Sequence, residues 1–153
     1  MANTYHQVYI QSIFAVKYRN AYIHKSWRPE LQKVIGNLIN EMGNKCIIVN
    51  GVEDHMHCFF ALKPDISISE AMQRIKSKSS KWINKSNFVN HKFEWQKGFG
   101  CFSYGKSQIP NVYQYIQNQE AHHRQWDFLD EYTALLKKFE IDFDENYIFH
   151  KPI

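Results

Sequence analysis

Hydrophobic and polar residues follow two distinct spacings along the chain. Aromatic and β-branched residues gather in residues 5–16, 46–52 and 55–62, which is typical of β-strands. Residues 28–42 and 67–85 instead carry apolar side chains three and four positions apart, the spacing of an amphipathic helix. The first two-thirds of the chain therefore predicts three strands and two helices.

Residues with known capping and turn preferences mark the ends of these elements. Gly43 supplies a stop signal after the first helix, and Pro64 ends the third strand. Ser67 with Glu70 three positions later forms the capping-box pattern at the start of the second helix. The polar pair 53–54 joins two apolar strands directly, so a hairpin is predicted there.

The remaining third of the chain predicts a short strand pair and two more helices. Residues 93–95 and 99–104 are the aromatic segments of the strand pair. A helix is expected over residues 107–123, with Ser107 as its cap and a proline tolerated in the first turn. A last helix is expected over residues 128–139, and we assign no role to the acidic segment 140–153.

The order strand, helix, strand, strand, helix, strand is that of the ferredoxin-like, or RRM-like, α+β fold. Such a fold has an antiparallel sheet with two helices on one face. We expect one domain over residues 1–153, with a core at about 4–104 and the C-terminal helices as additions. If the two core helices cover one face of the sheet, the other face is left open.

Composition narrows the class of protein. The chain has 153 residues, 44% of them hydrophobic, which favours a folded domain over a disordered one. Its three cysteines are too few and too widely spaced for a disulfide framework or a zinc finger, so free thiols in a reducing compartment are expected. Neither a leader nor a membrane span is recognisable, and we predict a cytoplasmic protein that does not enter a membrane.

Positive charge is concentrated in the second predicted helix. The formal net charge of the chain is +4, which is compatible with a polyanionic partner. Candidates for contacts to DNA phosphates are Arg74, Lys76, Lys78 and Lys81. The alternative interpretation of these residues is an ordinary solvated helix face.

Two histidines stand out in the third predicted strand. Because side chains alternate along a strand, His55 and His57 share one face, whereas Met56, Cys58 and Phe60 face the opposite side. Imidazole is the commonest protein ligand of transition metals. The pair is therefore a candidate for two ligands of a divalent metal, which still lacks a third ligand.

The predicted helix over residues 107–123 offers a phenol and an amide that could complete this site. Tyr115 and Gln119 are four residues apart and so lie on one helical face. The phenol could act as a nucleophile beside the metal. Tyr113 is an alternative to Tyr115 in this role, but it points about 200° away from Tyr115 and has no glutamine one turn later. His122 and His123 can reach the same face, and their roles remain open between ligand, DNA contact and packing.

Taken together, the histidine strand and the tyrosine helix resemble the single-tyrosine HUH transposases of the insertion-sequence-two-hundred-like family, which includes the REP-associated tyrosine transposases. The resemblance implies an enzyme that cleaves and rejoins single-stranded DNA at hairpin-marked ends through a 5′-phosphotyrosine. It assigns Tyr115 as the nucleophile and His55, His57 and Gln119 as ligands of Mg²⁺ or Mn²⁺. It further implies a homodimer, in which the tyrosine helix can act in trans, bound to single-stranded or hairpin DNA.

Two other functions remain compatible with the sequence. A domesticated relative could bind and cut chromosomal palindromes as a host protein. A ferredoxin-like sheet can also bind single-stranded nucleic acid without catalysis, as RNA-recognition modules do, although their aromatic signature is missing here.

Overall fold

The protein is built on a four-stranded antiparallel sheet. A computed structural model describes residues 4–144. The strands are β1 (Tyr9–Ala15), β2 (Lys45–Gly51), β3 (His55–Ala61) and β4 (Gly100–Tyr104), arranged in the order β2-β3-β1-β4. This order and the antiparallel pairing confirm the predicted ferredoxin-like α+β plan.

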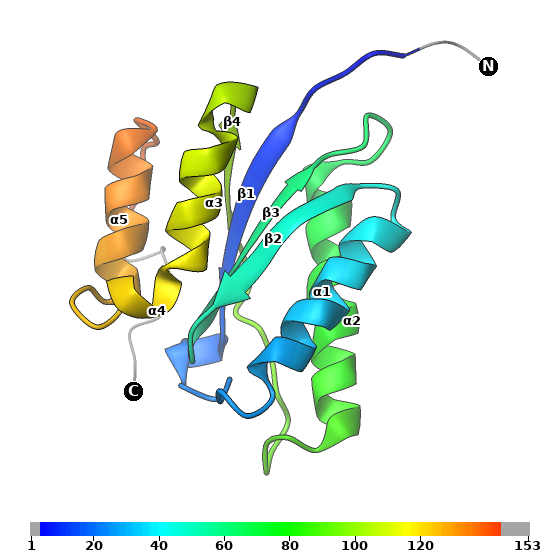
Figure 1. Ribbon diagram of the computed structural model, residues 1–153. Helices are drawn as coiled ribbons and strands as arrows, with labels where there is room; N and C mark the ends of the chain where they lie inside the picture. The colour runs from blue at the N-terminus through cyan, green and yellow to red at the C-terminus, as the bar shows by residue number, and fades with distance from the viewer. Residues whose placement is uncertain (1–3, 145–153) are drawn as a thin grey trace.

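Helices cover both faces of this sheet, as Figure 1 shows. Helices α1 (Arg28–Glu41) and α2 (Ile68–Ser86) lie on one face. On the other face lie α3 (Ile109–Gln117), α4 (Gln119–His122) and α5 (Phe128–Lys138). Two short 3-10 turns, η1 and η2, span Lys17–Arg19 and Lys106–Gln108.

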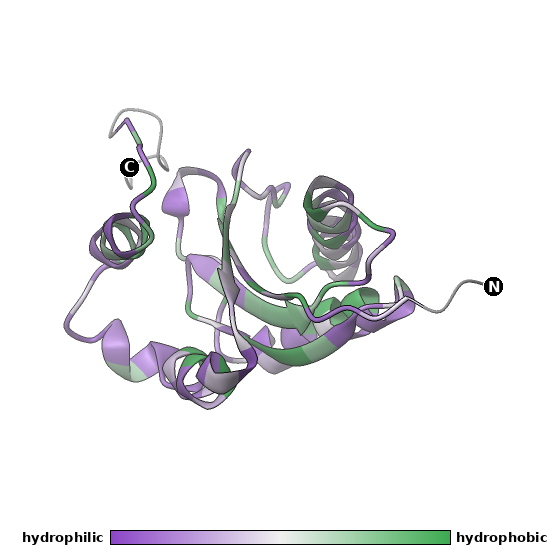
Figure 2. Cartoon of the chain, turned by 90° about the horizontal axis from the view of Figure 1, so that it is seen from above, coloured by the Kyte–Doolittle hydropathy of each residue, from purple (hydrophilic) through white to green (hydrophobic). Residues whose placement is uncertain are grey.

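The layer between the sheet and α1 and α2 is the larger apolar core. Alternate residues of the two central strands point into it, among them Phe14 of β1 and Met56 and Phe60 of β3. Leu31 of α1 and Met72 of α2 meet them from the helices. The green strands between the helices in Figure 2 show the same concentration of hydrophobic residues. The predicted division of β3 into a core-facing set and a histidine set is thus confirmed for the core side.

The histidine face is not open, which corrects our expectation. One apolar cluster joins Ile13 and Phe102 of the sheet to Phe128 and Tyr132 of α5, and a second joins the sheet to α3. Burying the apolar stripe of α5 stabilises this arrangement, since an exposed stripe of that size is unfavourable in water. The C-terminal helices therefore form a third layer over the histidines.

Two glycines mark places where the backbone approaches another group closely. At Gly51, which ends β2, a Cβ atom would lie 2.3 Å from the carbonyl oxygen of His55, so the β2–β3 hairpin has no room for a side chain there. At Gly100, which begins β4, a Cβ atom would lie 2.6 Å from the hydroxyl oxygen of Tyr132. The ring of Tyr132, a residue of α5, thus packs directly against the backbone of β4.

The local signals at helix ends have mixed outcomes. The side chain of Ser67 accepts a hydrogen bond from the Glu70 N–H at 3.0 Å, which confirms the predicted cap of α2. Ser107 does not cap the next helix. Instead, the Gln108 side chain accepts from the Gly105 N–H at 2.8 Å, across the first turn of η2.

Two predicted elements differ in the structure. The segment 93–95 does not pair with β4; Trp95 forms a single bridge with Val16, and its indole N–H donates to Ser79 Oγ at 2.9 Å. The predicted helix over residues 107–123 is interrupted at Asn118, whose φ of −92° and ψ of 18° lie outside the helical region. That interruption separates α3 from α4 and changes the direction of the chain.

The ends of the chain and its apolar segments complete the description. The first strand, predicted over residues 5–16, begins only at Tyr9, where its partners in β3 and β4 begin to pair with it. Within residues 4–144 no helix has the length and hydrophobicity needed to cross a membrane. Of the acidic segment 140–153, residues 145–153 lie outside the described part. The three cysteines are free thiols.

Candidate active site

Strand β3 places His55 and His57 side by side under the third layer. Both imidazoles are 0% exposed, and their ring centroids lie 5.2 Å apart. The residues opposite them on β1 are Ala15 and Ile13. These flanking side chains are apolar, so the polar partners of the histidines must come from other positions.

The Nδ1 atom of each histidine has a hydrogen-bond partner on the side away from α5. His55 Nδ1 is 2.8 Å from Asp54 Oδ1, and His57 Nδ1 is 3.0 Å from the side-chain nitrogen of Gln11. The hydroxyl of Tyr104 in turn donates to Gln11 Oε1 at 2.7 Å. Such hydrogen bonds fix the orientation of an imidazole ring. They leave both Nε2 atoms directed at the same space under α5.

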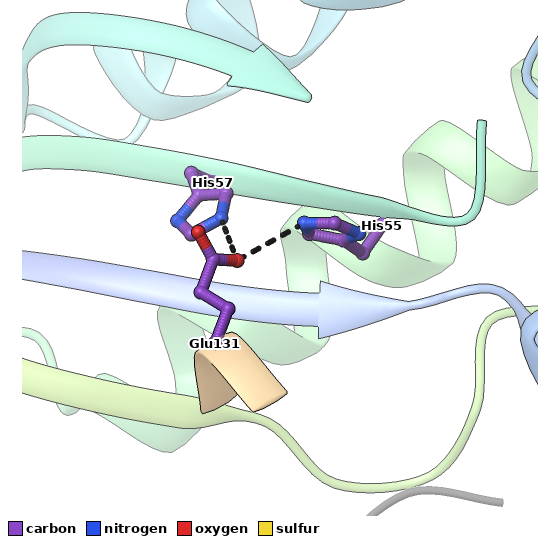
Figure 3. Close-up of side chains that lie close together, drawn as sticks. All are labelled: His55, His57 and Glu131. Atoms are coloured by element: carbon purple, nitrogen blue, oxygen red, sulfur yellow. Dashed lines mark hydrogen bonds and ion pairs between the residues drawn. The ribbon is translucent and has the colours of Figure 1, made fainter. Parts of the chain in front are cut away.

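Glu131 of α5 occupies that space. Its Oε1 atom lies 3.3 Å from His55 Nε2 and 3.2 Å from His57 Nε2, and the two contacts are drawn in Figure 3. The carboxylate is only 1% exposed. One ligand atom from each of these three residues lies within 4.8 Å of the others, close enough to share one metal ion.

The same carboxylate contacts both residues predicted on the tyrosine helix. The hydroxyl of Tyr115 donates a short hydrogen bond to Glu131 Oε2, and the Gln119 amide nitrogen donates to that atom at 2.9 Å. The amide oxygen of Gln119 is 3.3 Å from His55 Nε2. The structure therefore brings all four predicted residues together around a fifth one, and it does so within a single chain.

The remaining candidates divide clearly. His123 joins the cluster, with Nε2 at 3.1 Å from Gln119 Oε1 and 3.2 Å from Glu131 Oε1. The ring of His122 packs at 4.9 Å from that of Tyr115. Tyr113 is 38% exposed on the outer side of α3.

Burial and charge set the protonation states of this cluster. Burial of Glu131 opposes ionisation, but His57 and the hydrogen bonds from His123 and His55 hold the pKa of the carboxyl far below its usual range. Burial alone would lower the pKa of His55, yet its hydrogen bonds to Asp54 and Glu131 raise it to about 9. Burial dominates at His57 and lowers its pKa.

Tyr115 is held as a neutral phenol. Burial, followed by the negative charge of Glu131, raises the pKa of its hydroxyl well above the usual value for tyrosine. Burial and the neighbouring carboxylate thus favour the protonated form of this phenol.

The donor set fits a divalent cation. It combines two imidazole nitrogens, a carboxylate oxygen and an amide oxygen, all with second hydrogen-bond partners or full burial. The carboxylate and amide oxygens suit Mg²⁺ or Mn²⁺, whereas imidazole nitrogens are typical ligands of Zn²⁺, Fe²⁺ and Ni²⁺. An anionic ligand would leave less net charge on the ion than the neutral His, His, Gln set expected from the sequence.

The sequence analysis missed Glu131 and Gln11, and it assigned Asp54 only to the hairpin turn. Glu131 interrupts the apolar stripe of α5, falling one turn after Phe128 and one turn before Leu135. Gln11 is likewise a fully buried polar residue in a mostly apolar strand. A polar residue within an apolar pattern was the available signal in both cases.

The four basic candidates for DNA contacts lie on α2, across the sheet from this cluster (Figure 1). Arg74 pairs with Glu70 at 2.7 Å, and Lys76 donates to the carbonyl oxygens of Gln96 and Gly98 at 2.7 and 2.8 Å. Burial lowers the pKa of Lys76 to about 8. Lys78 and Lys81 are exposed, so they are the better placed of the four for a phosphate.

Comparisons with known proteins agree on one kind of relative. The family profile described as "Transposase IS200 like" matches residues 4–119. A protein of Deinococcus radiodurans R1 crystallised as a candidate transposase is similar in structure, with a TM-score of 0.63, 16% identity, and coverage of 78% of this chain and 95% of that one. A REP-associated tyrosine transposase bound to a REP hairpin is similar too, with a TM-score of 0.60, 15% identity, and coverage of 80% and 73%. No curated protein matches the chain by sequence.

Proposed function

Because this chain belongs to the IS200-like transposase family, we propose that it cleaves and rejoins single-stranded DNA through a covalent bond to Tyr115. His55, His57 and Gln119 hold a divalent cation, Mg²⁺ or Mn²⁺, in this proposal. The substrate is DNA with hairpin-marked ends. The observation that carries the proposal is the convergence of Tyr115, Gln119 and both histidines on Glu131.

The covalent step exchanges one phosphate ester for another. The Tyr115 oxygen bonds to phosphorus and the bond from phosphorus to the 3′-oxygen breaks, so the 5′-phosphate becomes attached to tyrosine. The phenol loses its proton to solvent as its oxygen attacks, and the departing 3′-oxygen takes up a proton to become a hydroxyl, so the exchange releases no net proton. Since a phenolate is also a leaving group, the same step runs backwards when another 3′-hydroxyl attacks.

Each supporting residue has a defined task in this scheme. A bound divalent ion would supply Lewis-acid stabilisation of charge on the non-bridging phosphate oxygens. Asp54 and Gln11 orient the two imidazoles so that both Nε2 atoms face the ion site. The covering helices bury His55 and His57 completely, which keeps bulk water away from the ion site.

The test is covalent adduct formation. The purified protein is incubated with labelled single-stranded DNA that carries the hairpins flanking its own gene, with Mn²⁺, Mg²⁺ or EDTA, and analysed by denaturing electrophoresis. We expect a metal-dependent protein–DNA adduct that Tyr115→Phe abolishes, while hairpin binding persists. Tyr113→Phe, two residues away on the exposed side of α3, is the matched control.

An adduct that persists in Tyr115→Phe would show that another group is the nucleophile. Hairpin binding without an adduct in either metal would instead favour a non-catalytic DNA-binding relative. The RNA-recognition alternative is not favoured, because α3, α4 and α5 cover the sheet face on which such modules stack bases.

Whether the tyrosine acts within one chain or across a dimer is decided by mixing inactive variants. The proposed partner is a second copy of the chain. If the site is shared in trans, His57→Ala and Tyr115→Phe proteins mixed together regain adduct formation. The described chain has Tyr115 beside its own His57, with ring centroids 6.1 Å apart, so we expect no recovery unless α3 exchanges between copies.

A further inference from the structure

A pocket of about 290 Å³ opens between α3, α5 and the end of β4, next to the candidate nucleophile. Its lining includes Gln108, Asn111 and Tyr115 from one side and Leu135 and Lys138 from the other. We propose that this pocket holds one unpaired nucleobase of the DNA, adjacent to the phosphate that Tyr115 attacks, and that it gives the protein a base preference at that position. The inference rests on the proposed function.

The position of the pocket follows from two facing helices. Asn111 and Tyr115 are one turn apart on α3, and Glu131, Leu135 and Lys138 form the facing stripe of α5. Tyr115 lines this pocket, and its hydroxyl contacts Glu131 of the facing helix. A strand whose phosphate reaches that hydroxyl therefore has its neighbouring nucleotide close to the pocket.

The lining has the chemistry of a base site. Val112 and Leu135 are buried apolar side chains, and Tyr104 adds an aromatic ring. Bases have apolar faces that stack on or pack against such groups. Lys138 is an exposed cation at the rim, suited to the phosphate that follows the base.

Two amides supply the means of telling bases apart. Within residues 4–144, the Asn111 amide has no hydrogen-bond partner. The Gln108 oxygen accepts from the Gly105 N–H, which leaves its NH₂ group for a ligand. Asparagine and glutamine amides carry a donor and an acceptor side by side, the pattern that matches a base edge.

The experiment measures adduct formation on a set of oligonucleotides. The cleaved phosphate is first mapped with the wild-type protein, and each flanking position is then replaced in turn by all four bases. We expect a preference at one position adjacent to that phosphate. Asn111→Ala should reduce this preference by about tenfold or more, which is the value of one good amide–base pair. Preferences at other positions should remain.

Two further variants make the test specific. Gln108→Glu retains the acceptor for the Gly105 N–H but removes the NH₂ donor, so it should alter the same preference. Gln114→Ala changes an exposed amide on α3 outside the pocket and should leave every preference unchanged. The inference is overturned if Asn111→Ala keeps the wild-type preference, or if the wild-type protein shows none next to the cleaved phosphate.

Failure of the proposed function gives a different result. In that case the wild-type protein forms no adduct with any oligonucleotide. The pocket is then tested by fluorescence anisotropy of the same oligonucleotides, where a base-dependent affinity that Asn111→Ala removes supports a base pocket. Affinities that depend equally on base in both proteins would overturn it.

Discussion

The two faces of strand β3 are built from opposite chemistry. Met56, Cys58 and Phe60 point into an apolar core, whereas His55 and His57 point into a layer of buried amides and carboxylates. Burial of the first set is favourable by itself, at about 25 cal/mol for each Å² of apolar surface. Burial of the second set is unfavourable unless every polar atom finds a partner.

The difference leads us to expect that the apolar face contributes mainly stability and the histidine face the proposed chemistry. In the histidine layer Glu131 accepts hydrogen bonds from Tyr115 and Gln119 and contacts the imidazoles. A protein that needed only stability would fill this layer with apolar side chains, as the opposite face does. Substitutions on the two faces should therefore separate stability from chemistry.

The largest expected effect is on the histidine face. His57→Ala should lower the rate of adduct formation by more than about 100-fold, since even residues that only support a metal ligand contribute 10- to 100-fold. Far-UV circular dichroism should show the fold retained. Adduct formation at the wild-type rate would remove His57 from the proposed metal site.

The opposite pattern is expected on the apolar face. Phe60→Ala should lower the free energy of unfolding by about 3–5 kcal/mol, because Phe60 is fully buried and leaves a cavity. Urea denaturation measures this loss. The rate of adduct formation per folded molecule should stay near the wild-type value. A clear fall in that rate would contradict the separation of stability and chemistry between the two faces.

Metal binding tests how much Glu131 and Gln119 each contribute to holding the ion on the histidine face. Binding of Mn²⁺, followed by electron paramagnetic resonance, should weaken about tenfold or more in Glu131→Gln if the carboxylate is a ligand, because the anionic oxygen is lost. Gln119→Ala should weaken it less. Unchanged affinity in Glu131→Gln would restrict the ligands to the neutral set.

The pH dependence of stability differs between the faces as well. His55 has its pKa raised to about 9, so its protonated form contributes stability that is complete below pH 6.5 and declines as the pH rises toward 9. Metal-free protein should lose about 1 kcal/mol in unfolding free energy for each pH unit between pH 7 and 8. The window stops at 8 because Lys76, with its lowered pKa of about 8, acts in the opposite direction above it.

Urea denaturation in EDTA at pH 7.0 and 8.0 checks this expectation. Asp54→Asn should flatten the dependence, because the hydrogen bond that His55 donates to Asp54 is the main cause that raises the pKa of His55. A wild-type stability that does not change over this range would mean that His55 is neutral in the folded protein.

The smallest effect is expected for a substitution outside both faces, on α2, and it concerns hairpin binding. Lys81 is exposed and lines a basic groove. If it contacts a hairpin phosphate, Lys81→Ala should weaken hairpin binding several-fold for every hairpin sequence. It should also reduce by about one the slope of log affinity plotted against log salt concentration. Lys33→Ala on the outer side of α1 is the matched control, and equal effects of both would indicate non-specific attraction.

The sequence predicted features of these two faces that depend on residues near one another in the chain, and it missed features that depend on residues far apart in the chain. Strand β3 and helices α1, α2 and α5 were foreseen because their hydrophobic spacing is local. His55 and His57 were singled out by strand alternation and Tyr115 and Gln119 by helical spacing, and a resemblance between motifs then assigned their roles. Glu131 was not found, because its role depends on α5 folding back over a strand about 70 residues earlier.

The break at Asn118 was missed for a related reason. A continuous helix over residues 107–123 satisfies the local pattern, yet the structure ends α3 at Gln117 and restarts at Gln119. The Asn50 side chain donates to the carbonyl oxygens of Ile116 and Gln117 at 2.9 and 3.2 Å. These are long-range partners for the end of α3, and the sequence pattern does not reveal them.

The side chain of Tyr132 packs closely against Gly100, and this contact helps to position α5 on the sheet. Glu131 precedes Tyr132 on that helix, so we expect a methyl group added at position 100 to disturb the carboxylate when it pushes the tyrosine ring aside. In a library of all single substitutions scored for adduct formation, position 100 should rank among the active-site positions. A residue without a side chain would thus be as intolerant of replacement as the histidines it never touches.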